Sequence, residues 1–426
     1  MRADFGKKHT YKIRTLPPCS RKRGARGVFV TAIFKEDHLK TAERLTKIPP
    51  YLFMELRKKI TKAKADGIDV ISLAIGDPVE PTPDGIIDEL ARRAGDPENH
   101  RYPTDEEKGM LRFRQEVALW YAARYGVSLN PENEILALIG SKEGCHHFIL
   151  ARINPGDVVL MTDPGYPAYR ASILMGGGEP YNVPIRAENG YLPVFDEIPS
   201  DILKRARGMF LNYPNNPTGA CATRKFFDEL VAFARQYDIA VCYDNPYSEM
   251  VFPGQERLSF MMADGARDVG IELNSLSKPF NMTGWRIGMA VGNSELIAAI
   301  SKVKENTDSG IFNPIQYAGV YALKHEAEAI GHMIAIYTRR RELVLKTLDK
   351  IGIRFDPPKG TFYLWVPVPK GMTSLEFTNR LFEKTAVVVA AGTAYGQYGE
   401  GFIRISLTVP DDRLALAMQR IEKEFS

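Results

Sequence analysis

The chain has 426 residues, of which 44% are hydrophobic and 25% are charged, a composition typical of a folded globular protein and not of wholesale disorder. Its length exceeds that of one ordinary hydrophobic core, so we expect two domains, or one large domain with a smaller one. No apolar run approaches the roughly 20 residues needed to span a bilayer. We therefore predict a soluble, cytoplasmic protein with no membrane partner.

The net charge of +4 is unevenly distributed along the chain. Residues 1–34 carry nine Lys and Arg side chains against one acidic residue, Asp4, and removing that excess leaves about −4 for the rest. Such a balance does not indicate a nucleic-acid partner. Residues 1–38 are predicted to be a basic, disordered extension. A start codon placed too far upstream is an equal alternative, and an organelle import signal is less favoured because hydroxyl content is low.

The cysteines are widely spaced and have no CxxC motif, which favours reduced, buried thiols over disulfides or a metal site. They are Cys19, Cys145, Cys221 and Cys242. The adjacent His146 and His147 would diverge by about 100° on a helix. No metal site is expected.

From about residue 130 to residue 295, short apolar runs alternate with helical patterns. The runs predict strands over 134–140, 157–165, 208–214, 239–247, 270–277 and 286–293, with helices over 142–153 and 224–237. Apolar strands alternating with helices predict an α/β fold with a mostly parallel sheet sandwiched by helices. The glycine-rich segment 175–180 is expected to be a turn.

After residue 301 the pattern changes to a smaller α+β domain. A long amphipathic stretch over about 314–351 precedes predicted strands over 360–368 and 401–409. We predict an N-terminal arm and part of the small domain over 39–75, a large ligand-binding domain over 76–305, and a small C-terminal domain over 306–426.

Polar residues follow five of the predicted strands. Ligands in open α/β sheets bind in the crevice beyond the carboxyl ends of the strands, so these residues form the candidate site. They are Ser141 and Lys142, and residues 163–169, 212–219, 244–247 and 274–278. No GxGxxG motif follows a strand and no GxxxxGK[ST] motif occurs, which argues against nicotinamide-binding and nucleotide-hydrolysing enzymes.

One group of these residues suits an anion. The segment IGSKEG places Ser141 where a helix begins, and free backbone N–H groups and the helix dipole favour negative charge there. Ser275, Ser277 and Arg286 would add hydroxyl and guanidinium donors to the same anion. Each signal alone is weak, because a serine before a helix is usually an N-cap; together they indicate a phosphate cradle.

A second group suits a cationic aromatic ring. Asp244 ends an apolar strand, and a carboxylate buried there needs a cationic partner such as a protonated ring nitrogen. Tyr247 supplies a phenol, Tyr166 an aromatic face and Asn216 a side-chain amide. Together with Lys278, whose amine can form an imine, these features match the requirements of pyridoxal 5'-phosphate.

The motifs NYPNNPTG, YDNPY and SLSKPFNMTGWRIG resemble those of the class I/II aminotransferases, which are fold type I pyridoxal-phosphate enzymes. The resemblance runs from about residue 42 to the C-terminus, with the motifs in the family's order. The blocks AERLTKIPPYLF, LIGSKEG, DPGYPAYRAS and NTDSGIFNPIQYAG look more narrowly like the LL-diaminopimelate aminotransferase subfamily.

The resemblance implies roles for individual residues. Lys278, Asp244 and Tyr247 would be catalytic, with Lys278 binding the cofactor and moving a proton, and Asp244 keeping the ring nitrogen protonated. The implied cofactor-binding residues are Ser141, Lys142, Tyr166, Asn216, Asp244, Tyr247, Ser275, Ser277, Lys278, Arg286 and, from the neighbouring subunit, Tyr102. The implied substrate-binding residues are Arg404, Gly76, Tyr51, Lys142, Asn216 and Asn313. Arg404 would clamp an α-carboxylate with its planar fork; as a strand arginine it could instead be a solvated edge residue.

Several positions stay open at this point. Tyr51 suits core packing nearly as well as substrate contact, and Asn313 could cap the helix that follows it. The loop 101–110 is about two residues longer than the family pattern leads us to expect, which leaves open whether Asp105, Glu106 or Glu107 contacts the distal end of the substrate. A role for Tyr102 requires a homodimer with shared active sites.

The implied reaction is a ping-pong transamination between a small amino acid and a 2-oxo acid. The subfamily suggests LL-2,6-diaminopimelate and 2-oxoglutarate as substrates, with tetrahydrodipicolinate, glutamate and water as products, in lysine and diaminopimelate biosynthesis. Another aminotransferase, acting on alanine, aspartate or aromatic amino acids, is the first alternative. A pyridoxal-phosphate lyase or decarboxylase and a non-catalytic protein that binds the cofactor are less favoured.

Overall fold

The computed structural model describes residues 41–48, 52–103, 105 and 107–425. The predicted basic extension over 1–38 lies outside these residues, as do Tyr51 and Glu106. Residues 42–426 form one compact unit. The predicted boundaries at residues 75 and 305 therefore stay predictions.

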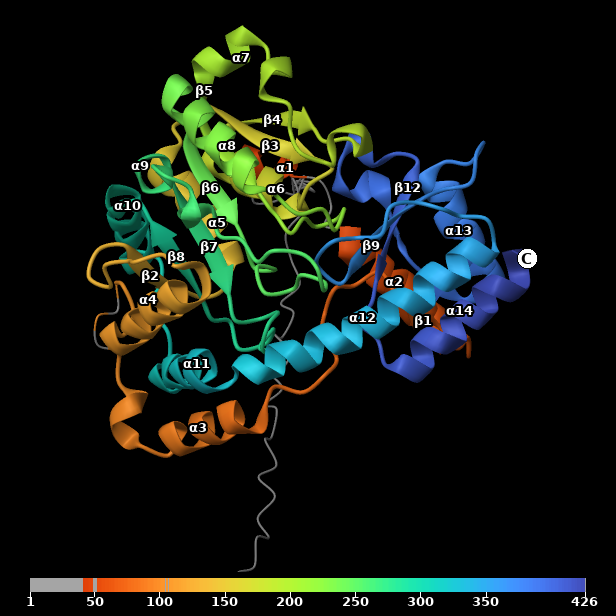
Figure 1. Ribbon diagram of the computed structural model, residues 1–426, viewed down its shortest axis with the longest axis horizontal. Coiled ribbons are helices and arrows are strands. Elements are labelled where there is room, and N and C mark those ends of the chain that lie inside the picture. Colours follow the sequence, from red (N-terminus) through yellow and green to blue (C-terminus); the bar gives the residue numbers. More distant parts are fainter. Residues whose placement is uncertain (1–40, 49–51, 104, 106, 426) are drawn as a thin grey trace, which may run out of the picture. The chain divides into compact units, whose positions relative to one another are not determined.

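A seven-stranded sheet holds the predicted apolar runs (Figure 1). Its strands are β2 (Ile135–Leu138), β3 (Val158–Asp163), β4 (Glu179–Pro184), β5 (Ala206–Leu211), β6 (Ala240–Asp244), β7 (Gly270–Ser275) and β8 (Gly288–Gly292). In the order β2-β8-β7-β6-β5-β3-β4, only the two pairings of β8 are antiparallel. The prediction of a mostly parallel sheet is confirmed. Since β2 and β7 both run against β8, they run in the same direction, and the five strand ends singled out above lie at one edge.

Successive strand residues point to opposite sides of this sheet, and the buried residues on both sides are apolar. Helices therefore cover both faces. On one face, Val159, Phe210 and Ile271 pack against α5 (Ser141–Arg152), α6 (Pro167–Gly176) and α10 (Ser294–Glu305). On the other, Leu160 and Met209 belong to the core that α4 (Leu111–Tyr125) and α8 (Arg224–Tyr237) complete. Helix α8 has the predicted bounds. The remaining helices before α10 are α1 (Glu43–Thr46), α2 (Leu52–Ala65), α3 (Asp84–Ala94), α7 (Ser200–Arg205) and α9 (Ala266–Val269).

Two details differ from the sequence prediction. Segment 175–180 holds the end of α6 at Gly176, then a turn with a left-handed φ of +88° at Gly177, and then the start of β4 at Glu179. Because β4 is an edge strand, it tolerates Pro180, which masks the strand in the sequence. The long amphipathic stretch is two helices, α11 (Asn313–His325) and α12 (Ala327–Lys350), separated by Glu326.

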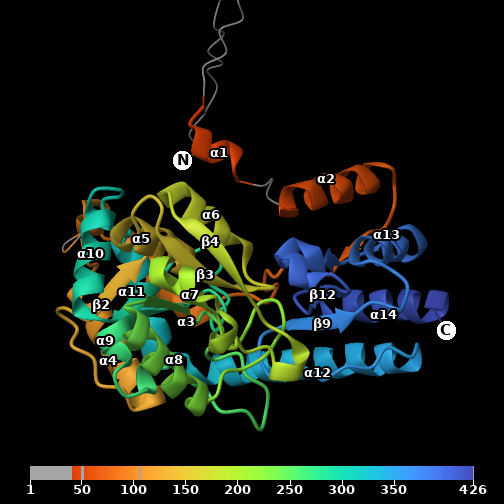
Figure 2. The same ribbon diagram turned by 90° about the horizontal axis from the view of Figure 1, so that it is seen from above.

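A smaller antiparallel sheet follows α12 in the chain. Its order is β11-β12-β9, formed by β9 (Tyr363–Pro367), β11 (Ala390–Ala391) and β12 (Phe402–Ser406). The short strand β1 (Ile71–Ser72) pairs with β10 (Val387–Val388). Helices α13 (Ser374–Thr385) and α14 (Asp411–Phe425) complete this part, and α12 extends alongside α14 from the neighbourhood of α11 (Figures 1 and 2).

The described residues also bear on membrane and metal binding. None of the helices they form is both long and apolar enough to cross a bilayer. Within the same residues, no three His, Cys, Asp or Glu side chains gather into a group that could hold a metal ion. Cys145, Cys221 and Cys242 are free thiols.

Candidate active site

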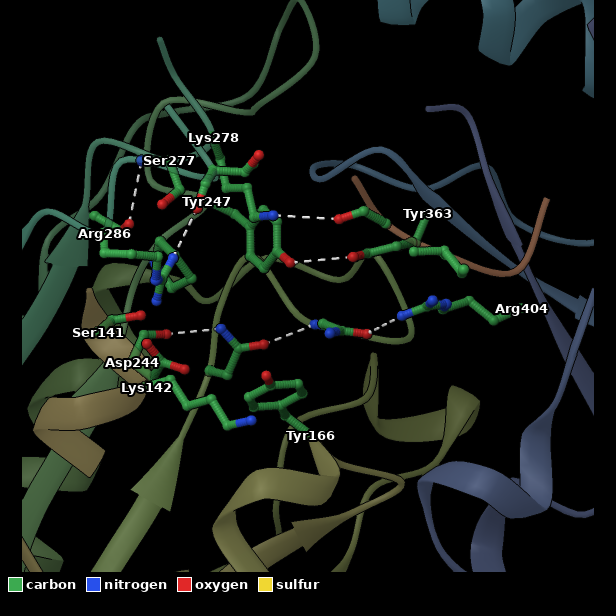
Figure 3. A pocket seen from close by; sticks show the side chains of 17 residues that line it. Ser141, Lys142, Tyr166, Asp244, Tyr247, Ser277, Lys278, Arg286, Tyr363 and Arg404 are labelled. Carbon is green, nitrogen blue, oxygen red and sulfur yellow. Dashed lines mark hydrogen bonds between the residues drawn. The ribbon is translucent and has the colours of Figure 1, made fainter. Parts of the chain in front are cut away.

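A pocket of about 250 Å³ lies where the five strand ends meet (Figure 3). Most of the predicted site residues line it. These are Gly76, Ser141, Lys142, Tyr166, Asn216, Asp244, Tyr247, Ser275, Ser277, Lys278, Arg286 and Arg404. Two further lining residues, Asn212 and Pro246, fall within the predicted segments 212–219 and 244–247 but had no individual role assigned. Three lining residues were not predicted. They are Ile75, Thr283 and Tyr363.

The amine of Lys278 lies inside this pocket, just after β7. Its Nζ donates a hydrogen bond to the Gly76 carbonyl oxygen at 3.2 Å and lies 5.6 Å from the centre of the Phe362 ring. Burial lowers the pKa of Lys278 to about 8, and the positive charges of Arg286 and Arg404 act in the same direction. Lys278 can therefore act as a neutral nucleophile and base much more readily than an ordinary lysine.

Asp244 ends β6 and is 4% exposed. Its Oδ2 accepts a hydrogen bond from the Tyr169 hydroxyl at 2.7 Å, whereas Oδ1 is buried and accepts none from the described residues. Burial raises the pKa of Asp244 to about 6, against the opposing effects of the Tyr169 and Ser141 hydroxyls. A protonated ring nitrogen in the pocket would provide Oδ1 with a charged donor, which is the partner that this buried carboxylate lacks.

Replacing Asp244 with Asn should remove a pH dependence from the stability of the cofactor-free protein. The folded chain has an Asp244 pKa of about 6 against an ordinary value of 3.8. The folded state therefore holds this proton more tightly, and stability is lost as pH rises from about 4 to about 6. The free energy of unfolding falls by about 3 kcal/mol over this range. In thermal unfolding, the midpoint of the Asn variant should exceed that of the wild type by clearly more at about pH 7 than at about pH 4. An equal difference between the two midpoints at both pH values would contradict the burial argument.

Anion-binding groups gather at one end of the pocket. Ser141 is the first residue of α5, and the preceding Gly140 has a left-handed φ of +81°. The buried Ser277 Oγ has no hydrogen-bond partner among the described residues. Arg286 donates from Nη1 to the Thr283 carbonyl at 2.8 Å, and a Cβ at Gly140 would lie 2.4 Å from its Nη2. Hydroxyls, helix N–H groups and a guanidinium thus face one place, which suits a dianion such as a phosphate.

Arg404 occupies the other end. It lies on β12, the middle strand of its sheet, and is 1% exposed, so it is not a solvated edge residue. Nη1 donates to Asn216 Oδ1 at 2.8 Å, and Nη2 donates to the Ala74 carbonyl at 2.5 Å. The guanidinium carbon lies 4.0 Å from the centre of the Tyr363 ring. The fork is therefore held in a fixed orientation, as two-point recognition of a carboxylate requires.

Tyr363 contacts both Arg404 and Tyr247. Its hydroxyl lies 3.2 Å from that of Tyr247, and burial holds the pKa of Tyr247 well above its usual range. Gly76 passes so close that an added Cβ would lie 1.8 Å from the Tyr363 hydroxyl. Glycine is thus required for this approach.

A Gly76→Ala substitution should displace either Tyr363 or the backbone at Gly76, whose carbonyl oxygen accepts the hydrogen bond from Lys278. We expect kcat/KM to fall at least about tenfold, because shifts of about 1 Å in positioning groups cost up to a hundredfold. The matched control is Gly331→Ala in α12, where an added Cβ meets nothing within 4 Å. Steady-state kinetics check both variants; an unchanged kcat/KM in the Gly76 variant would show that the contact is irrelevant.

Asn212, which begins the predicted segment 212–219 but had no individual role assigned, holds two of the predicted site residues in place. Its Nδ2 donates to the Asp244 carbonyl at 2.7 Å, and its Oδ1 accepts from the Asn216 backbone N–H at 2.7 Å. The signal was available, since Asn212 begins the polar segment after β5. Tyr363 carried no such signal, because its approach depends on the meeting of two distant parts of the chain.

Other predicted residues lie elsewhere. Tyr102 is 80% exposed and borders a separate hollow with Asp105, Glu107 and Ser309. Asn313 is the first residue of α11, and its side-chain oxygen accepts a hydrogen bond from Gln316 at 3.4 Å. Together with Tyr51 and Glu106, which lie outside the described residues, their roles stay predictions.

Comparisons with known proteins agree with the motifs. The family model of class I and II aminotransferases matches residues 68–421. An LL-diaminopimelate aminotransferase of Moorella thermoacetica is 49% identical over 385 residues, which cover 90% of this chain and 98% of that protein. One of Halothermothrix orenii is 48% identical over 384 residues, with coverages of 90% and 98%.

A solved structure, substrate-bound BacF of Bacillus subtilis, matches with a TM-score of 0.86 and 36% identity, over 90% of this chain and 98% of that one. The family predicted from the motifs and the predicted fold class are both confirmed. The chain is an enzyme that belongs to the class I and II aminotransferases.

Proposed function

We propose that this aminotransferase moves the amino group of LL-2,6-diaminopimelate to 2-oxoglutarate, giving tetrahydrodipicolinate, glutamate and water, within diaminopimelate and lysine biosynthesis. The observation that carries the reaction class is the layout of the pocket, where the Lys278 amine lies between an anion cradle and the Arg404 fork. The choice of substrate is supported by relatives of that name, which are 48% and 49% identical over nearly their whole length.

Pyridoxal 5'-phosphate is the proposed cofactor, in keeping with the family. Two buried polar atoms, Asp244 Oδ1 and Ser277 Oγ, line the pocket without hydrogen-bond partners among the described residues. Asp244 Oδ1 would accept a hydrogen bond from a protonated ring nitrogen, and the Ser277 hydroxyl would donate one to the phosphate. Ser141, Ser275 and Arg286 would hold the phosphate with Ser277. When bound, this cofactor supplies an electrophilic carbonyl carbon and a ring that accepts electron density.

The remaining chemistry belongs to side chains of this protein. Lys278 Nζ, partly neutral because burial lowers its pKa to about 8, would take a proton from the amino donor and return it to the product side. Asp244 would hold a proton on the ring nitrogen. Tyr247 and Asn216 would contact the ring oxygen, and Tyr166 would cover one ring face.

Substrate recognition is proposed to rest on carboxylates. Arg404 would bind the α-carboxylate that diaminopimelate and glutamate share, and Gly76 would border it. Lys142 lines the pocket with an exposed side chain and is our candidate for the distal carboxylate of glutamate, in addition to its place beside the cofactor.

We also propose that the enzyme works as a cytoplasmic homodimer. Tyr102 is a large aromatic side chain that is 80% exposed and lies outside the pocket. Tyr102 would bind the cofactor phosphate in the neighbouring subunit, which would account for its exposure in a single chain. Asp105, Glu106 or Glu107 of the same loop would then approach the distal ammonium of diaminopimelate.

A substrate panel tests the proposed specificity. The purified enzyme with 2-oxoglutarate should form glutamate from LL-diaminopimelate at the highest kcat/KM, with meso-diaminopimelate, alanine, aspartate and aromatic amino acids as competitors. Turnover of one of those competitors without turnover of LL-diaminopimelate would overturn the specific proposal while leaving the family intact. Release of ammonia or CO₂ in place of glutamate would overturn the reaction class.

A further inference from the structure

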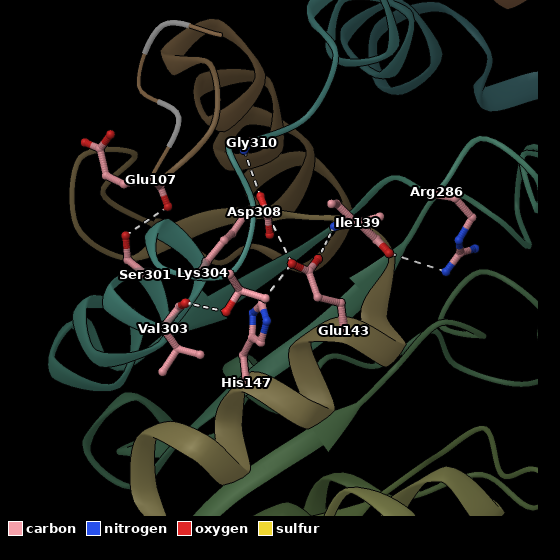
Figure 4. A network of polar contacts seen from close by, with 11 residues as sticks. Glu107, Ile139, Glu143, His147, Arg286, Ser301, Val303, Lys304, Asp308 and Gly310 are labelled. Carbon is pink, nitrogen blue, oxygen red and sulfur yellow. Dashed lines mark hydrogen bonds and ion pairs between the residues drawn. The ribbon is translucent and has the colours of Figure 1, made fainter. Parts of the chain in front are cut away.

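A buried cluster of charges lies beside the anion end of the pocket (Figure 4). Lys304, in the last turn of α10, has a fully buried side chain. Its Nζ donates to Glu143 Oε1 at 3.1 Å and to both carboxylate oxygens of Asp308 at 2.9 Å. Asp308 in turn accepts the Gly310 backbone N–H at 2.8 Å. The cation is therefore fully buried, and the two carboxylates that hold it are 15% (Glu143) and 20% (Asp308) exposed.

Glu143 ties this cluster to the turn that leads into α5. It is the third residue of that helix, and its Oε2 accepts a short hydrogen bond from the Ile139 backbone N–H. Gly140, at the N-cap, has no side chain that could perform this task. The Ile139 carbonyl oxygen accepts from Arg286 at 3.4 Å. Glu143 thus holds the turn 139–141, which leads into Ser141 and which Arg286 contacts through the Ile139 carbonyl.

This position of a carboxylate creates an electrostatic conflict. The amino end of α5 favours anions, and Glu143 brings a negative charge close to the place proposed for the phosphate dianion. His147 Nδ1 lies 3.5 Å from Glu143 Oε1, but burial lowers the pKa of His147 to about 4 and leaves the ring neutral near pH 7. The positive charge that compensates Glu143 is therefore that of Lys304.

The cluster also reaches the loop that carries Tyr102. In α10, Ser301 Oγ donates to the Glu107 backbone carbonyl at 2.9 Å, one turn before Lys304 (Figure 4). The side chain of Glu107 points away from the cluster. Helix α10 is therefore bonded to two segments: to Glu143 beside the turn 139–141 through Lys304, and to the loop that carries Tyr102 through Ser301.

We propose that Glu143 and Lys304 are positioning residues for the cofactor phosphate. Glu143 shapes the turn 139–141 by its hydrogen bond to Ile139, and Lys304 offsets part of the negative charge that Glu143 and Asp308 would otherwise direct at the phosphate. This inference rests on the proposed cofactor. The hydrogen bond and the charge are separable, because glutamine keeps an acceptor oxygen without the charge and alanine keeps neither.

The test measures release of the cofactor from the full-length holoenzyme by loss of the visible absorbance of the bound cofactor after rapid dilution. Lys304→Met should release it at least about tenfold faster than the wild type, because an uncompensated charge then faces the phosphate. The double variant Lys304→Met/Glu143→Gln should return to within about threefold of the wild type. Glu143→Ala, which keeps Lys304 paired with Asp308, should release it about tenfold faster through loss of the turn hydrogen bond.

Leu348→Ala, a buried change in α12, controls for general destabilisation. It should lower the unfolding midpoint without changing cofactor release. Wild-type release rates in both Lys304→Met and Glu143→Ala would overturn the inference, as would equal release from Lys304→Met and the double variant. If Lys304→Met does not fold, Glu143→Ala decides alone. A wild-type protein that binds no pyridoxal phosphate would instead overturn the proposed function.

Discussion

In a Lys278→Ala variant, kcat for the transfer from LL-diaminopimelate to 2-oxoglutarate is expected to fall at least about 10⁴-fold. The amine of Lys278 is the basic nitrogen at the centre of the pocket, and burial has already lowered its pKa to about 8. Lys278 is the group proposed to bind the cofactor and to move the proton, so its removal would eliminate nucleophilic and acid–base catalysis together. Steady-state glutamate formation measures the loss, and the visible spectrum of the bound cofactor should change as well.

A matched lysine distinguishes this effect from a change in charge alone. Lys225 lies on α8, and its side chain is 87% exposed. Lys225→Ala should keep the wild-type kcat and spectrum. Retained turnover in the Lys278 variant, with an unchanged cofactor spectrum, would contradict the assignment.

An Arg404→Lys variant should lose between about 10²- and 10³-fold in kcat/KM, mostly through KM. The substitution keeps the charge but removes the fork that Asn216 and the Ala74 carbonyl hold in place. The loss corresponds to about 3–4 kcal/mol, within the range for a truncated buried charge pair. Because the amino donor and 2-oxoglutarate share an α-carboxylate, KM should rise for both.

The control for this variant is Arg413→Lys, which alters a surface pair with Asp69. It should leave both KM values unchanged. A KM that rises for only one of the two substrates would show that Arg404 recognises a distal group and not the α-carboxylate.

The sheet and the floor of the pocket could be predicted because their signals are local. Each of the strands β3, β5, β6 and β7 is an apolar run followed directly by polar residues, and parallel strands necessarily bring those ends to one edge. Lys278, Asp244 and the serines of the anion cradle follow from that rule. The strand β4 escaped notice because Pro180 is tolerated only at an edge position, which the sequence does not reveal.

Contacts between distant segments could not be predicted in the same way. Tyr363 lines the pocket only because β9 meets the segment at Gly76, with 1.8 Å from a hypothetical Cβ to its hydroxyl. The pairing of Lys304 with Glu143 likewise joins residues 161 positions apart. For Tyr102 the sequence predicts a role that a single chain does not test, because that role concerns a partner subunit and the side chain is exposed in one chain.

The central claim is that this pocket takes an amino group from LL-diaminopimelate onto a bound cofactor and passes it on. A half-reaction tests it most directly. LL-diaminopimelate is added to the purified enzyme without any 2-oxo acid, and the visible spectrum of the bound cofactor is followed. We predict a stoichiometric loss of the visible band, one equivalent of tetrahydrodipicolinate, and recovery of the band when 2-oxoglutarate is added. A spectrum that LL-diaminopimelate leaves unchanged, in an enzyme that responds to another amino acid, would contradict the claim.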